Sequence, residues 1–116
     1  EAAALVTAVD HPGFGLHLDA GGMLLHGDTL DDVARALATP GVRHVHASDP
    51  SLAALGEGDS RAAAWHAALA ALLAPTGYDG CVSLEMRRQD GDRAALLAAS
   101  LGRLTAWYGA APRTRR

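Results

Sequence analysis

The strongest constraint on the fold is a regular alternation of helical and extended segments along a chain of 116 residues. Apolar periodicity and capping residues predict helices at 1–9, 29–39, 60–74 and 92–108. Short apolar segments between turn residues predict strands at about 14–19, 42–48 and 81–85. A helix between each pair of consecutive strands favours parallel strands joined by right-handed crossovers. The sequence therefore predicts an α/β protein.

Each predicted strand has one mainly apolar face and one polar face, because side chains alternate along a strand. The polar faces carry His17, Asp19, His44, His46, Ser48, Ser83 and Glu85. Parallel strands are normally apolar on both faces, so carboxylates and imidazoles on one side of all three strands are unusual. Because functional groups of α/β proteins gather at the carboxyl ends of the strands, we expect a site there.

Asp19, His46 and Glu85 are the strongest candidates on this polar face. A buried carboxylate is costly unless it is compensated, and coordination to a cation is one compensation. Oxygen and nitrogen donors without a thiolate favour one divalent metal ion of the Mn, Mg or Co type, with Zn also compatible. We therefore predict that these three side chains are metal ligands.

Four further residues are candidates for contacting a substrate or orienting a metal ligand, namely His17, His44, His26 and Asp49. His17 and His44 are alternatively ordinary packing residues on the strands. His26 is placed in the loop after the first strand. Asp49 is alternatively a residue that caps a turn.

Two other residues are expected to lie outside the site. His66, beside Trp65 on a predicted helix, is expected to be structural or exposed. Cys81, early in the third strand, is expected to fill the core.

The composition excludes several classes of protein. A net charge of −3 without a basic stripe argues against a general nucleic-acid binder. No apolar segment approaches the roughly 20 residues that a membrane span requires. The single cysteine excludes an internal disulfide and suits a reducing cytoplasm. The basic tail 112–116 is expected to be a solvated, disordered end, with contact to an acidic partner as the alternative.

The motifs in this order resemble the xylose isomerase-like family of sugar isomerases and epimerases, whose TIM barrels include an endonuclease IV-like branch. The resembling segments are 15–21, 42–49, the loop 55–59 and 77–85. Asp19 and His46 are 27 residues apart, and His46 and Glu85 are 39 apart. The resemblance implies the C-terminal three βα units of a (β/α)8 barrel, with residues 1–111 as part of that domain.

The resemblance also implies an activity. In the family, one metal ion is held by a glutamate, an aspartate, a histidine and a second glutamate, and Asp19, His46 and Glu85 match the last three. The first glutamate belongs to a strand that these residues do not include. The implied reaction is isomerisation or epimerisation of a sugar or sugar phosphate, with Glu85 as the catalytic acid/base beside a metal-bound carbonyl. A hydride-transfer route stays open.

Three positions depart from the family pattern. Gly22 stands where a histidine is common, Leu52 where ketose epimerases place an arginine, and Ser48 where a lysine is frequent. Two alternatives therefore remain, a non-catalytic fragment or binding module, and an endonuclease IV-like hydrolase. Three strands do not close a barrel. We expect a fragment whose missing barrel half comes from a longer protein or another chain, or a chain that self-associates.

Overall fold

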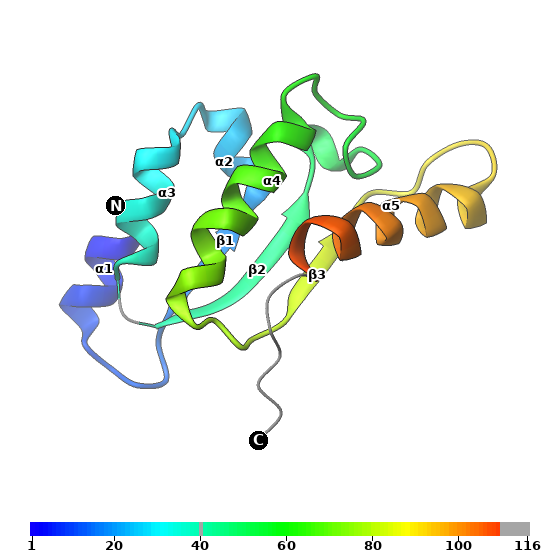
Figure 1. The fold of residues 1–116 in the computed structure, drawn as a ribbon. Helices are drawn as coiled ribbons and strands as arrows, with labels where there is room; N and C mark the ends of the chain where they lie inside the picture. Colours follow the sequence, from blue (N-terminus) through cyan, green and yellow to red (C-terminus); the bar gives the residue numbers. More distant parts are fainter. Residues whose placement is uncertain (40, 110–116) are drawn as a thin grey trace.

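The described residues, 1–39 and 41–109 of a computed structural model, form one three-stranded sheet with helices between the strands (Figure 1). The strands are β1 (Leu16–Asp19), β2 (Val42–Ser48) and β3 (Val82–Glu85). The helices are α1 (Ala2–Val9), α2 (Ala20–His26), α3 (Leu30–Leu37), α4 (Ala62–Leu73) and α5 (Arg93–Tyr108). The predicted basic tail 112–116 and the domain end at 111 lie outside the described residues.

The three strands run parallel in the order β1-β2-β3. Their register places Asp19 beside His46 and Ser48 beside Glu85. The sheet is open, because β1 and β3 are its two edges rather than neighbours. This arrangement confirms the predicted α/β class with parallel strands and helical crossovers, and it is consistent with part of a TIM barrel.

The core lies between one face of the sheet and its helices, and α4 crosses in front of β2 in Figure 1. Leu18 on β1 and Val45 on β2 point into this core and are buried. A second group of buried side chains joins α2, α3 and α4, and it comprises Ala20, Leu24, Val33, Ala62, Trp65 and Leu69. Burying these apolar side chains is the main force that holds the helices on the sheet.

The predicted bounds of all three strands and of four helices agree with the structure to within two residues. Helix α2 was not predicted, and the placement of His26 in a loop was wrong, because His26 is the last residue of this helix. The Asp19 side chain caps α2 by accepting a hydrogen bond from the Gly22 amide. A Cβ on Gly21 would lie 2.7 Å from the backbone of Asp49, so only glycine allows α2 to approach β2 this closely.

The prediction that Cys81 fills the core was also wrong, because the residue is exposed. It lies just before β3, which begins at Val82 and forms an edge of the sheet. Nothing among the described residues pairs with the outer side of this edge strand. No helix in the same part of the chain combines the length and the hydrophobicity that crossing a membrane requires.

Candidate metal centre

Asp19, His46 and Glu85 come together on the polar face, one from each strand of the sheet. One potential ligand atom from each side chain lies within 4.8 Å of the other two. All three side chains are half-buried. Among residues 1–39 and 41–109, no other group of three histidine, cysteine or acidic side chains has a geometry suited to a metal ion.

The donor set fits a divalent cation. His46 Nδ1 and Glu85 Oε2 are 2.8 Å apart, so the imidazole and the carboxylate lie in direct contact. Ligand atoms that share one ion, each about 2.1 Å from it, are separated by about 3 Å. His46 Nδ1 and Glu85 Oε2 therefore already have a spacing suited to sharing one ion. Two carboxylates and one imidazole are ligands compatible with Mn, Mg, Co or Zn.

The Asp19 carboxylate is oriented by two hydrogen bonds to the same oxygen. Asp19 Oδ1 accepts from the Ser48 hydroxyl at 2.5 Å and from the Gly22 amide at 3.0 Å. Partial burial raises the pKa of Asp19, but these hydrogen bonds outweigh it and hold the pKa below its usual value. The group is therefore a carboxylate at neutral pH, which is the form that binds metal.

His17 and His44 lie beside the three candidate ligands on the same face. The ring centroids of His17 and His46 are 4.2 Å apart, and those of His44 and His46 are 4.9 Å apart. Burial and the neighbouring imidazoles of His46 and His44 lower the pKa of His17. The structure thus brings both histidines to the site, in contact with a candidate ligand.

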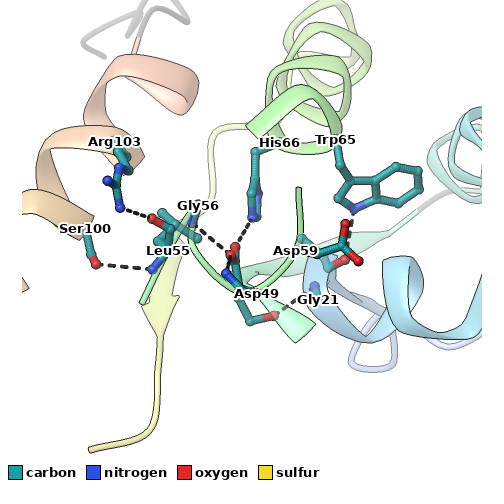
Figure 2. Close-up of polar contacts among 12 residues, drawn as sticks. Gly21, Asp49, Leu55, Gly56, Asp59, Trp65, His66, Ser100 and Arg103 are labelled. Atoms are coloured by element: carbon teal, nitrogen blue, oxygen red, sulfur yellow. Dashed lines mark hydrogen bonds and ion pairs between the residues drawn. The ribbon is translucent and has the colours of Figure 1, made fainter. Parts of the chain in front are cut away.

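His26 and Asp49 are not brought to this cluster. His26 is exposed at the end of α2, where Nδ1 lies 2.7 Å from the Gly22 carbonyl oxygen. The Asp49 carboxylate is buried and faces His66 on α4 and the loop that contains Gly56, as Figure 2 shows. Asp49 Oδ2 accepts hydrogen bonds from the Gly56 and Gly58 amides, at 2.9 and 2.8 Å.

The partner of Asp49 Oδ1 is His66, which is expected from the sequence to be structural or exposed and is buried in the structure. His66 Nε2 donates to Asp49 at 3.0 Å, and His66 Nδ1 lies 2.8 Å from the Tyr108 hydroxyl. The His66 ring also stacks on Trp107, with 5.1 Å between the centroids. Burial raises the pKa of Asp49, but its hydrogen bonds outweigh this and lower it overall. We refer to Asp49, His66 and Tyr108 as the buried polar cluster.

The site contains one residue whose role the sequence did not reveal. The alternation of side chains along β2 predicts Ser48 on the polar face, so its location near the site could be read from the sequence. Its contact with Asp19 was not predictable, because it depends on the register between β1 and β2 and on the close approach of α2.

The sequence of the chain matches the family described as xylose isomerase-like TIM barrel over residues 1–107. No curated protein and no solved structure matches it. The family match covers most of the chain and agrees with the parallel strands and helical crossovers of the structure. The chain therefore belongs to the xylose isomerase-like TIM barrel family.

Proposed function

We propose that this chain is the C-terminal part of a divalent-metal-dependent enzyme that isomerises or epimerises a sugar or sugar phosphate. The observation that carries the proposal is the convergence of Asp19, His46 and Glu85, with ligand atoms within 4.8 Å, on the polar face of the sheet. The family includes sugar isomerases and epimerases as well as endonuclease IV-like proteins. A small acidic chain without a basic stripe favours the sugar enzymes over a nucleic-acid enzyme.

The three side chains would hold the ion near the carboxyl ends of the three strands. When bound, a divalent ion supplies a Lewis acid that polarises a carbonyl oxygen. The Asp19 carboxylate is already oriented before a metal binds, because the Ser48 hydroxyl and the Gly22 amide both donate to it.

Glu85 is the proposed catalytic acid/base. Its side chain is 40% exposed, so its carboxylate remains accessible to a substrate as well as to His46. The carboxylate removes a proton from the carbon next to the carbonyl and exchanges it with solvent. Delivery of a proton to the neighbouring carbon would move the carbonyl. Delivery to the opposite face of the same carbon would invert it, and that step would need a second acid, the glutamate that the resemblance places on a strand outside these residues. His17 and His44, which line the same face, are proposed to orient His46 or to contact the sugar hydroxyls.

The open sheet is proposed to be completed by the remainder of a barrel or by further copies of this chain. Large apolar side chains are exposed on the helices that contact the two edge strands, with Leu5 and Val9 on α1 and Leu97 and Leu101 on α5. Covering them would remove apolar surface from water. The lone, unpaired Cys81 suits a cytoplasmic enzyme.

The test measures hydrogen exchange at the reacting carbon in D2O, with NMR as the readout. The chain is incubated with Mn²⁺ and a panel of free and phosphorylated ketopentoses and ketohexoses. We expect Mn²⁺-dependent deuterium uptake at the carbon next to the carbonyl of one class of sugar, and its loss in Glu85→Gln. The paramagnetic ion is removed with a chelator before each spectrum is recorded.

Three other results would contradict the proposal. Isomerisation without deuterium uptake indicates hydride transfer, which removes the proton role of Glu85. Cleavage of DNA at abasic sites indicates an endonuclease IV-like activity. Mn²⁺ binding without any reaction, including after addition of the remainder of the barrel, indicates a binding module.

A further inference from the structure

Ser48 occupies a distinctive place at the end of β2, where one residue contacts both the candidate metal centre and the adjacent helix. It is 1% exposed, although it lies on the polar face of the sheet. Its hydroxyl donates to Asp19 Oδ1 at 2.5 Å and accepts from the Gly21 amide at 3.0 Å. A buried hydroxyl normally requires such partners, and here both partners belong to the segment that contains a candidate ligand.

The two contacts determine which oxygen of Asp19 is available to a metal. Oδ1 accepts from the Ser48 hydroxyl and from the Gly22 amide. Within the described residues, Oδ2 accepts no hydrogen bond. Two donors on one oxygen fix the plane of the carboxylate and leave the other oxygen free. Asp19 Oδ2 is therefore the oxygen suited to ligation.

The Ser48 hydroxyl is directed toward its protein partners rather than toward the open side of the site. Its single proton is donated to Asp19, it accepts from the Gly21 amide, and the residue is buried. The close approach that allows this second contact depends on Gly21, because a Cβ there would lie 2.8 Å from the Ser48 carbonyl oxygen. The local backbone is thus built to bring the Ser48 hydroxyl against Asp19.

We infer that Ser48 is a positioning residue, whose hydroxyl orients the Asp19 carboxylate so that Oδ2 binds the metal. This inference rests on the proposed metal centre. Hydrogen-bond partners of metal ligands typically contribute about 10- to 100-fold to metal affinity. Ser48 acts through Asp19 and touches neither the metal nor the substrate.

The experiment measures the Mn²⁺ dissociation constant by electron paramagnetic resonance for the wild-type chain and three variants. Ser48→Ala removes the hydroxyl, and Ser48→Thr keeps it. Ser100→Ala is the matched control, because Ser100 is 0% exposed and its hydroxyl accepts from the Leu55 amide at 3.2 Å, in a contact with no candidate ligand. Circular dichroism verifies that each variant is folded.

We expect Ser48→Ala to weaken Mn²⁺ binding by about tenfold or more. Ser48→Thr and Ser100→Ala are expected to stay within about threefold of the wild type, since the first keeps the donor and the second removes a hydroxyl elsewhere. If Ser48→Ala does not fold, Ser48→Cys replaces it, because a thiol keeps the shape of the side chain but donates weakly. The expected loss is again about tenfold.

Two results would overturn the inference while leaving the metal centre intact. One is Mn²⁺ binding by Ser48→Ala, or by Ser48→Cys in its place, that equals that of Ser100→Ala. The other is an equal loss in Ser48→Ala and Ser48→Thr, which would assign the effect to packing rather than to the hydroxyl. A wild-type chain that binds no Mn²⁺ would instead refute the proposed function and the inference together.

Discussion

This protein contains two histidine–carboxylate pairs that have nearly the same nitrogen–oxygen distance but differ in burial. His46 and Glu85 are 2.8 Å apart, with side chains 27% and 40% exposed. His66 and Asp49 are 3.0 Å apart, with side chains 1% and 0% exposed. The first pair lies on the polar face of the sheet, and the second lies beneath α4 (Figure 2). The contact distance alone therefore does not separate a candidate site from a structural pair.

The difference lies in how fully each pair is satisfied. Both oxygens of Asp49 accept hydrogen bonds, and both ring nitrogens of His66 have partners. In the candidate metal centre, within the described part of the chain, Glu85 Oε1 and Asp19 Oδ2 have no donor. A saturated cluster stabilises the fold, whereas a cluster with free acceptors has the capacity to bind a cation.

The largest expected effect on stability comes from removing the carboxylate of the buried polar cluster. Asp49→Ala leaves the Gly56 and Gly58 amides and His66 without their acceptor, so we expect a loss of about 3 kcal/mol in the free energy of unfolding. Urea denaturation followed by circular dichroism measures it. An unfolding free energy within about 0.5 kcal/mol of the wild type would remove the distinction between the two pairs.

Acid is expected to reduce the contribution of the buried polar cluster to the free energy of unfolding. The pKa of Asp49 is lower in the folded chain than its unfolded value of about 3.9, so its stabilisation is complete above that value. It is lost as the pH falls through the lower, folded pKa. We expect the unfolding free energy to decrease below about pH 4, and less steeply in Asp49→Asn. Equal slopes for the two chains, in urea titrations from neutral pH to the acid range, would contradict this assignment.

Tyr108 tests the outer end of the same cluster. Burial, with a smaller contribution from the Asp49 charge, raises the pKa of its hydroxyl, which stays protonated at neutral pH. Tyr108→Phe removes only the contact with His66 Nδ1, so we expect a loss of about 1 kcal/mol. The measurement is the urea midpoint at constant m value. A loss equal to that of Asp49→Ala would mean that the hydroxyl, rather than the carboxylate, holds the cluster together.

The smallest effect on stability is expected in the other pair. Glu85→Gln keeps the side-chain shape beside His46, and the position is partly exposed, so we expect a change within about 0.5 kcal/mol. Mn²⁺ affinity and sugar exchange should decrease in the same variant. A large destabilisation in metal-free buffer would make His46 and Glu85 a second structural pair.

The candidate site was largely predictable from local patterns. The alternation of side chains along three short strands placed Asp19, His46 and Glu85 on one face, and parallel pairing brings such residues together. Helix α2 was not predictable from local patterns, since its two glycines disfavour a helix and its cap depends on Asp19. Cys81 is exposed because it lies just before β3, which is an open edge of the sheet, and not within the strand as predicted.

The buried polar cluster was beyond local patterns for a similar reason. Asp49 and His66 are 17 residues apart, and His66 and Tyr108 are 42 apart. No periodicity of one helix or strand relates these positions. Asp49 was a site candidate because it follows a strand, but the packing of α4 and α5 decides which way its carboxylate points.

The measurement that tests the central claim most directly is native mass spectrometry with Mn²⁺. It compares ion binding by the wild-type chain, Asp19→Ala and Asp59→Asn. Asp59 is the control carboxylate, because it pairs with Arg61 outside the site. We predict one tightly held ion per wild-type chain, its loss in Asp19→Ala, and its retention in Asp59→Asn. A folded wild-type chain without the ion, or equal binding by Asp19→Ala, would contradict the account.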